Sequence, residues 1–179
     1  MTAEVTIHDK TFIPFISASK IQARIKELGS LIDHDYTDKR PLLIGVLNGS
    51  AIFMADLLRN INEACEIAFI RVSSYEGTTS TGKVKSMMGL EDSIQGRHVI
   101  LVEDIIDTGD TAKYLIEELT AKNPASLRFA TILFKPTALK HEIHPDYVGF
   151  EIPPAFVVGY GLDYDGLGRN LPDIYQLKS

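Results

Sequence analysis

The chain has 179 residues, which is enough for one domain but too few for two domains of typical size. Hydrophobic residues make up 45% of it and charged residues 23%, as in folded globular proteins, so intrinsic disorder is disfavoured. With 18 Lys and Arg against 24 Asp and Glu, the net charge of −6 disfavours a non-specific nucleic-acid-binding protein. We therefore expect no nucleic-acid partner.

Cysteine content and targeting signals indicate the compartment. Cys65 is the only cysteine, so no disulfide can form within the chain, and its apolar neighbours favour an inert buried thiol over a nucleophile. The N-terminal segment lacks the basic and apolar regions of a secretion signal, and no apolar run is long enough to span a membrane. We expect a cytoplasmic protein with no membrane partner.

The first half of the chain predicts two helices and two strands. Apolar residues recur at helical spacing from Ile21 to Ile32, with Ser17 or Ser19 as the candidate N-cap. A continuous apolar run at 42–47 predicts a buried strand, and a second apolar-periodic helix follows at about 52–61. Another strand near 67–72 opens into the polar stretch 73–85, whose length and Gly, Ser and Thr content favour a functional loop or lid.

The second half continues the alternation of strands and helices. Apolar runs at 98–102 and 127–134 predict two more buried strands, with a helix around 115–119 between them. Shorter strands are expected near 147–152 and 156–158. This order predicts an α/β fold with a mostly parallel sheet flanked by helices, in which ligands bind at the carboxyl ends of the strands. We expect one domain over residues 1–179.

The segment directly after the strand at 98–102 carries the most chemistry. Glu103 and Asp104 stand at the strand end, where carboxylates can accept hydrogen bonds from sugar hydroxyls or help to hold a divalent cation. Gly109 allows close approach of the backbone to an anion, and Thr108 and Thr111 add hydroxyl donors at the start of a helix. The combination favours a phosphate-binding loop.

A plainer interpretation is open for each of these residues alone. Thr108 or Asp110 can serve only as a helix cap, and the acids can be solvated. The common phosphate motifs do not occur, because the chain has no P-loop and Tyr164 stands at the third glycine position of a dinucleotide-binding pattern. The phosphate loop is therefore of another kind.

The run from Val99 to Thr111 resembles the 5-phosphoribosyl 1-diphosphate (PRPP) binding motif of type I phosphoribosyltransferases. Its Glu-Asp-Ile-Ile-Asp-Thr-Gly form most resembles the hypoxanthine (hypoxanthine-guanine) branch, and the resemblance extends over residues 12–178. It implies a small hood formed by the terminal segments, including 162–179, over the sheet. It also implies transfer of the phosphoribosyl group from PRPP to N9 of hypoxanthine or guanine, with Mg²⁺ bound at the diphosphate.

The resemblance assigns roles to the residues of the acidic segment. Asp107 would lie beside purine N7 as the general acid or base. Asp110, an acid inside an anion-binding loop, is expected to point away from the phosphate or to act in the first turn of the helix. The residues implied to bind ribose and its 5′-phosphate are Glu103, Asp104, Asp107, Thr108, Gly109, Asp110 and Thr111, and those implied to hold Mg²⁺ are Asp163, Glu103 and Asp104.

A second loop, at 48–51, corresponds to the family's diphosphate loop, where backbone N–H groups meet the diphosphate around a non-proline cis peptide. The chain departs from the family at Asn48, because a Lys or Arg is expected there. Closure of the family's mobile loop over the ribosyl centre would exclude water. The residues implied to bind diphosphate are Asn48, Gly49, Ser74, Tyr75 and Arg169.

The purine pocket is also implied by the resemblance. Lys135 would donate to the 6-oxygen of the base, which favours a 6-oxopurine over adenine, and Phe156 would stack on the ring. Without the resemblance, Lys135 would be interpreted as a solvated charge and Phe156 as core. The residues implied to bind purine are Ile105, Lys135, Phe156, Val157 and Asp163.

Two alternatives to this function are kept. One is transfer to another base, such as xanthine or a pyrimidine, and the other is an RNA-binding regulator of the same fold, which the net charge disfavours. His141 and His144 lie three residues apart without a third ligand nearby, so a metal site there is disfavoured. Members of the family are dimers or tetramers, and we expect a homodimer or homotetramer.

Overall fold

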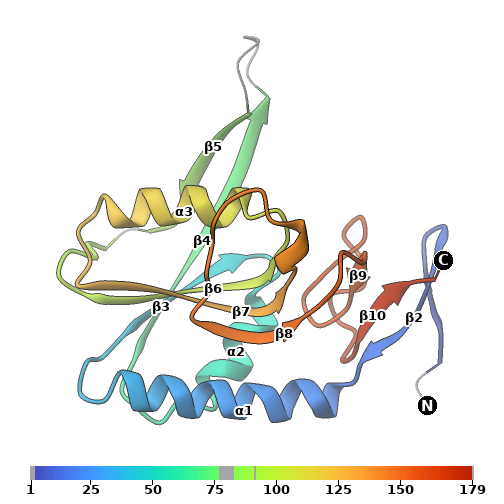
Figure 1. Ribbon diagram of the computed structural model, residues 1–179, viewed down its shortest axis with the longest axis horizontal. Coiled ribbons are helices and arrows are strands. Elements are labelled where there is room, and N and C mark those ends of the chain that lie inside the picture. The colour runs from blue at the N-terminus through green and yellow to red at the C-terminus, as the bar shows by residue number, and fades with distance from the viewer. Residues whose placement is uncertain (1–2, 77–82, 91, 179) are drawn as a thin grey trace.

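The computed structural model describes residues 3–76, 83–90 and 92–178, without the side chains of 73–86. Its main sheet has the strand order β5-β4-β3-β6-β7-β8. Helix α3 covers one face of this sheet, and α1 and α2 cover the other (Figure 1). The six strands are β3 (Leu42–Leu47), β4 (Glu66–Glu76), β5 (Lys83–Met88), β6 (His98–Ile106), β7 (Ser126–Phe134) and β8 (Tyr147–Glu151), and the helices are α1 (Ala18–Asp35), α2 (Ala51–Leu58) and α3 (Asp110–Thr120).

The predicted sheet is confirmed. Parallel pairing joins β4 to β3, β3 to β6, β6 to β7 and β7 to β8, and only β5 runs antiparallel. The parallel strands are buried on both faces, because apolar side chains alternate between two core clusters: Ile100 and Val102 pack on the α1 and α2 side, and Val99 and Leu101 on the α3 side. The carboxyl ends of these strands therefore lie along one edge of the sheet.

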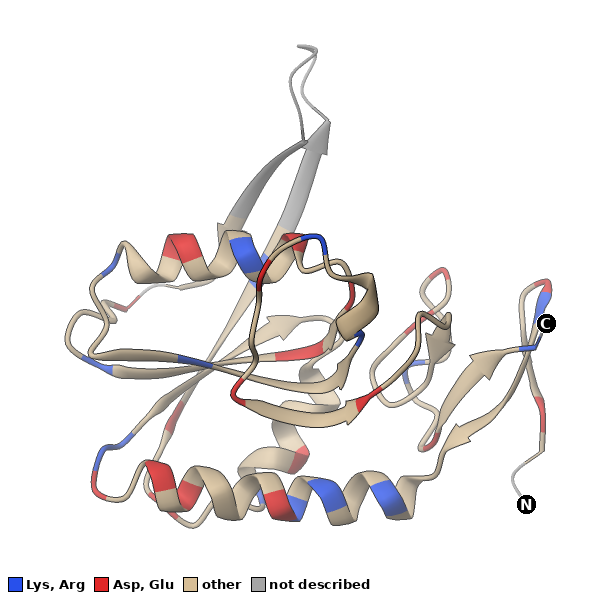
Figure 2. Cartoon of the chain, in the orientation of Figure 1, with Lys and Arg blue, Asp and Glu red and all other residues tan. Residues whose placement is uncertain are grey.

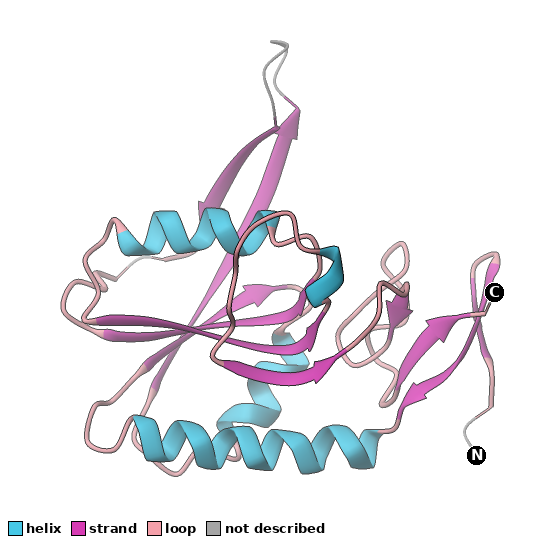
Figure 3. Cartoon of the chain, viewed as in Figure 1, coloured by secondary structure: helices cyan, strands magenta, loops and turns pink. Residues whose placement is uncertain are grey.

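A second, four-stranded antiparallel sheet forms the hood. Its order is β1-β2-β10-β9, and it contains strands and loops beside the carboxyl edge of the main sheet (Figure 3). The hood has its own small core, in which Phe12 and Val158 are fully buried. The expectation of a hood from the terminal segments is confirmed. Its strands are β1 (Val5–Ile7), β2 (Lys10–Ile16), β9 (Val157–Val158) and β10 (Ile174–Leu177).

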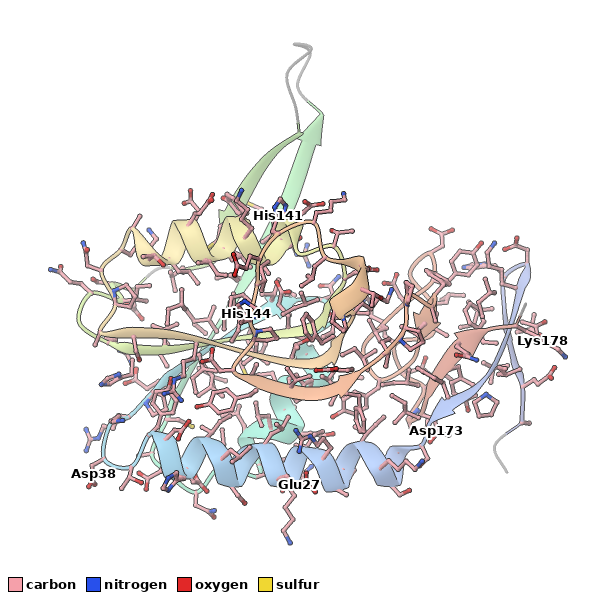
Figure 4. The ribbon with its side chains drawn as sticks, viewed as in Figure 1. Glu27, Asp38, His141, His144, Asp173 and Lys178 are labelled. Carbon is pink, nitrogen blue, oxygen red and sulfur yellow. The ribbon has the colours of Figure 1, made fainter. Side chains whose placement is uncertain are left out.

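The hood is connected to the main sheet at the start of α1. Ser17 is the N-cap, as predicted, but its hydroxyl makes no capping hydrogen bond. The carboxylate of Asp173, which lies beside the start of α1 in Figure 4, instead accepts a hydrogen bond of 2.6 Å from the backbone N–H of Ala18. One acid from the far end of the chain therefore caps the first helix.

The extent of the polar stretch at 73–85 was predicted wrongly. We expected a loop there, but β4 continues to Glu76 and pairs antiparallel with β5, which begins at Lys83. Antiparallel pairing satisfies the backbone of a polar segment without any apolar periodicity, so this hairpin leaves no strand signal in the sequence. Within the described ranges, none of the helices combines the length and apolar composition needed to cross a bilayer.

Candidate active site

A cavity of about 220 Å³ opens between the carboxyl edge of the main sheet and the hood. Its lining comes from the end of β6, the end of β7 and the segment around β9. All of the lining residues except Leu162 were predicted as site residues. They are Asp104, Ile105, Asp107, Lys135, Phe156, Val157, Leu162 and Asp163.

Lys135 is the buried cation of this cavity. Only 6% of its surface is exposed, and its Nζ donates a hydrogen bond of 2.7 Å to Oδ2 of Asp107. The carboxylate of Asp107 itself is about half exposed. A buried ammonium has three donors. Lys135 can therefore hold Asp107 in place and still donate to a carbonyl oxygen in the cavity.

Phe156 forms an aromatic wall. Its side chain is 44% exposed, unlike that of a core residue. Tyr164 meets its ring edge-on, with centroids 5.7 Å apart, and Phe12 lies 6.0 Å away in a tilted orientation. Neighbours from the hood thus fix the ring while part of it faces solvent, as a stacking platform requires.

A smaller hollow of about 100 Å³ lies next to this cavity and is lined by Glu103 and residues 105–112. Gly109, with a φ of 80°, is the N-cap of α3, and this left-handed conformation turns the chain so that the first turn of the helix closes the hollow. The free backbone N–H groups of a helix start suit an anion. Ile105 and Asp107 line both spaces, so a single ligand can extend from one to the other.

The loop after β3 packs directly against the end of β6. The peptide bond between Leu47 and Asn48 is cis. A Cβ atom on Gly49 would lie 1.6 Å from Oδ2 of Asp104, so no side chain fits at that position. A Cβ on Gly161 would in turn lie 2.1 Å from the carbonyl oxygen of Gly49. Three segments therefore meet here through backbone and one carboxylate.

Asn48 has a cationic neighbour in place of a cationic side chain. The guanidinium of Arg71, from β4, donates a hydrogen bond of 2.9 Å to its Oδ1. The pairing of β3 with β4 brings these residues together, because Leu47 stands opposite Arg71 in the register. The loop thus has a positive charge beside it that does not come from its own sequence.

Acidic groups converge on the other side of Gly49. Burial raises the pKa of Asp104 to about 6, and the nearby carboxylate of Asp163 contributes to the same shift. Asp163 pairs with Arg169 at 2.7 Å and accepts a hydrogen bond of the same length from the backbone N–H of Gly166. A buried carboxylate with a raised pKa next to a second carboxylate is a setting in which a cation is favourable.

These acids do not form a complete metal centre by themselves. Across residues 3–76, 83–90 and 92–178, no group of three His, Cys, Asp or Glu side chains is placed to hold a metal ion. Mg²⁺, however, is usually bound by one or two carboxylates together with the phosphates of a substrate. Asp104 and Asp163 fit that mode of binding.

The structure places Ser74 and Tyr75 on β4, where their backbones pair with Lys85 and Val84 of β5, and it does not describe their side chains. Both were predicted as diphosphate-binding residues, and that prediction is untested. Sequence reasoning missed Leu162 in the base cavity. It also missed Arg71, for which the only signal was a basic residue at the end of an apolar strand.

Comparisons with known proteins agree with this geometry. The family model for the phosphoribosyl transferase domain matches residues 17–165. The hypoxanthine-guanine phosphoribosyltransferase of Bacillus subtilis is 48% identical over 164 residues, which cover 91% of this chain and 91% of that protein. The chain belongs to the hypoxanthine-guanine phosphoribosyltransferase family.

Solved structures of this phosphoribosyltransferase family share the fold. A hypoxanthine phosphoribosyltransferase from Staphylococcus aureus is 43% identical, with a TM-score of 0.84 over 93% of this chain and 91% of that one. The Trypanosoma cruzi hypoxanthine phosphoribosyl transferase is 37% identical, with a TM-score of 0.85 over 97% of this chain and 95% of that one. The resemblance inferred from residues 99–111 is confirmed.

Proposed function

We propose that the chain is a purine salvage enzyme that transfers the 5-phosphoribosyl group from PRPP to N9 of hypoxanthine or guanine. The products are inosine or guanosine monophosphate and diphosphate. The observation that carries this proposal is the buried Lys135, held by Asp107 where the large cavity meets the small hollow. A base, a ribose and a 5′-phosphate can follow one another across this junction.

The base cavity selects a 6-oxopurine through Lys135. Its ammonium donates to the 6-oxygen, whereas adenine presents an amino donor at that position, so a cationic donor disfavours adenine. Phe156 stacks on the ring, and Ile105 and the backbone of Val157 complete the pocket. Asp107 accepts a proton at N7 as N9 forms the bond to the ribosyl carbon. Lys135 keeps that carboxylate in position.

The sugar and its phosphate lie along the residues that follow β6. Glu103 and Asp104 accept hydrogen bonds from the ribose hydroxyls. The 5′-phosphate binds to the hollow through backbone N–H groups at the start of α3 and the hydroxyl of Thr111, and the hydroxyl of Thr108 joins them only by giving up its hydrogen bond to Asp110. Gly109 gives the backbone its close approach, and Asp110 faces away from the anion toward other residues.

The diphosphate binds between the loop after β3 and Arg169. Gly49 and Asn48 supply backbone N–H groups, Arg169 supplies charge, and Ser74 and Tyr75 contribute from β4. Asp163 and Asp104 would hold Mg²⁺ together with phosphate oxygens of the substrate, without Glu103 as a third ligand, and when bound the ion would stabilise the negative charge of the leaving group. Arg169 now pairs with Asp163, so this pair opens or rearranges when diphosphate and metal bind.

Three wider expectations belong to the same proposal. The protein acts in the cytoplasm, as a homodimer or homotetramer. Residues 1–179 form one phosphoribosyltransferase domain. Gel filtration with light scattering checks the oligomeric state.

The decisive experiment incubates the protein with PRPP and Mg²⁺ and, separately, hypoxanthine, guanine, xanthine, adenine or uracil. We expect nucleotide and diphosphate with hypoxanthine or guanine and little product with adenine. Product with xanthine or uracil alone would identify another base as the substrate. No product with hypoxanthine and guanine would overturn the proposal.

Lys135 and Lys140 both lie on the connection between β7 and β8, and they give a matched test of base recognition. Lys135→Met should raise KM for hypoxanthine by about 100-fold, because the base loses a charged donor and Asp107 loses its partner. Lys140→Met removes a lysine five positions on that does not line the base cavity. It should leave KM for the base unchanged, and equal effects of the two variants would remove Lys135 from this role.

A further inference from the structure

Asp110 places a carboxylate in the lining of the small hollow, beside the start of α3, and Glu103 and Asp107 line the same hollow. Three groups hold this carboxylate. His141 donates from Nε2 to Oδ1 at 2.8 Å, Lys140 donates from Nζ to Oδ2 at 3.1 Å, and the hydroxyl of Thr108 donates to Oδ2 at 3.0 Å. Lys140 and His141 come from the connection between β7 and β8, about thirty residues along the chain.

The same connection is tied to the loop by its backbone and by apolar contacts. The N–H of Lys140 donates to the carbonyl of Thr108 at 3.0 Å. Ile143, which is buried, and Leu139 face the Cα of Gly109. Figure 4 shows His141 beside the first turn of α3, and in Figure 2 basic and acidic segments adjoin where the connection passes that turn. The loop and the connection thus form one packed unit.

The charge of the loop depends on the groups that hydrogen-bond to the carboxylate of Asp110. The hydrogen bonds from His141, Lys140 and Thr108, in that order, hold the pKa of Asp110 well below its usual range, so its carboxylate is ionised at neutral pH. An unpaired carboxylate in this lining would repel a phosphate dianion. The hydrogen bonds from Lys140 and His141 instead compensate the charge of Asp110.

We propose that Lys140 and His141 are positioning residues for the 5′-phosphate, which hold the carboxylate of Asp110 and compensate its charge so that the loop accepts an anion, and that loss of either hydrogen bond weakens phosphate binding. This inference rests on the proposed function, because it assigns the hollow to the 5′-phosphate. Neither residue touches the phosphate, and both act through Asp110.

The other charged groups around Asp110 already form ion pairs of their own. On α3, Lys113 faces Glu117 at 4.0 Å, and in the loop Asp107 pairs with Lys135. On the connection, His144 and Glu142 are strongly exposed and face each other at 3.5 Å. Lys140 and His141 are therefore the charged or polar side chains from the connection that hold Asp110.

The experiment measures binding of ribose 5-phosphate by calorimetry at pH 8.5, where the phosphate is a dianion. His141→Leu should bind about 3- to 10-fold more weakly than the wild type, because Asp110 loses one of the donors that compensate its charge. KM for PRPP should follow the same ratio, while KM for the base does not.

Asp110→Asn tests whether the effect passes through the carboxylate. It should bind ribose 5-phosphate at least as tightly as the wild type at pH 8.5, and adding His141→Leu to it should change nothing. Binding by His141→Leu as tight as by the wild type, or an undiminished effect in the Asp110→Asn background, would overturn the inference. His144→Leu is the matched control, and we expect it to resemble the wild type.

The two proposals can fail separately. If the wild type binds ribose 5-phosphate and makes nucleotide from hypoxanthine or guanine, but His141→Leu binds as tightly as the wild type, only the role of His141 fails. If the wild type neither binds ribose 5-phosphate nor makes nucleotide from any base, the proposed function fails as well.

Discussion

The loops after β3 and β6 occupy equivalent places in the fold, yet they are built differently. Each leaves the carboxyl end of a parallel strand and leads into a helix. The loop after β3 contains Gly49, which has no room for a side chain because the carboxylate of Asp104 fills the space. The loop after β6 is open, with Gly109 in a left-handed conformation and hydroxyls on both sides of it.

The two loops share one property, which is that their positive charge comes from another element. Arg71 of β4 stands beside Asn48, and Lys140 and His141 of the β7–β8 connection stand beside Asp110. A protein with a net charge of −6 can thus bind phosphates although neither loop has a basic sequence. Neighbouring strands and connections supply the cations, and backbone N–H groups supply the geometry.

The largest expected effect comes from adding one methyl group to each loop. Gly49→Ala should lower kcat/KM by about 1000-fold, because the added Cβ displaces Asp104 and with it the end of β6. Gly109→Ala should cost about 10-fold, because a left-handed alanine is strained by about 1–2 kcal/mol. Its Cβ would meet the flexible ends of two side chains, Ile143 at 2.8 Å and Leu139 at 3.2 Å.

Steady-state rates with PRPP and hypoxanthine, together with thermal unfolding, compare these two alanine variants. Unfolding curves identify any variant that has lost its fold. A larger loss for Gly109→Ala than for Gly49→Ala, with both proteins folded, would contradict the difference between a closed loop and an open loop.

The next effect separates chemistry from binding. Asp107→Asn should lower kcat by about 100-fold, because an amide cannot accept the proton from N7, whereas the phosphate loop retains its backbone donors. KM for PRPP should change little. Unchanged turnover would remove Asp107 from acid–base catalysis.

The sequence predicted the loop after β6 because its residues are consecutive and follow a buried strand. The same reasoning failed for contacts between distant segments. The carboxylate of Asp110 meets Lys140 and His141 some thirty positions away, and nothing in the local pattern of either segment indicates this. Lys135 was identified only through the family resemblance, because a lysine with 6% exposure is exceptional.

The strands of the fold also divide into those that the local sequence predicts and those that depend on distant segments. The strands at 42–47 and 127–134 were predicted almost to the residue, since both are continuous apolar runs buried on two faces. Of the hood strands, only β9 was predicted, as the short strand near 156–158. The strands β1, β2 and β10 were not predicted, because β2 pairs with β10 across most of the chain, with Phe12 opposite Leu177. Such pairing depends on the fold of the whole molecule and leaves no local period in these short segments.

A smaller effect tests whether the loop after β3 depends on the positive charge of Arg71. Arg71→Met should raise KM for PRPP, and KM for diphosphate in the reverse reaction, by about 10-fold, because one charged group near the anion is lost. KM for hypoxanthine should not change. Adding Asn48→Lys should restore much of the affinity, since it returns a cation to the same place. No loss in Arg71→Met would show that backbone donors and Arg169 suffice.

The smallest effect concerns the carboxylate that closes the loop after β3. The pKa of Asp104 in the folded protein is about 6, above the ordinary value of 3.8, so the folded state holds this proton more tightly than the unfolded chain. Its contribution to stability is therefore present below pH 4 and is lost as the pH rises through 6. At pH 7.5 Asp104→Asn should raise the free energy of unfolding by about 1 kcal/mol, because the buried charge is gone.

The stability gain of Asp104→Asn should shrink as the pH falls, and it should disappear near pH 4, where the wild-type carboxyl is protonated too. Denaturant unfolding at pH 4, 6 and 7.5 measures it, with the exposed Asp165→Asn as the matched control. The same variant should bind PRPP and Mg²⁺ more weakly, since an amide is a poor partner for a cation and for ribose hydroxyls. A destabilised Asp104→Asn at pH 7.5 would mean that the loop after β3 needs this charge for its packing. A stabilised and inactive variant would show that the buried acid is retained for the ligand at the expense of the fold.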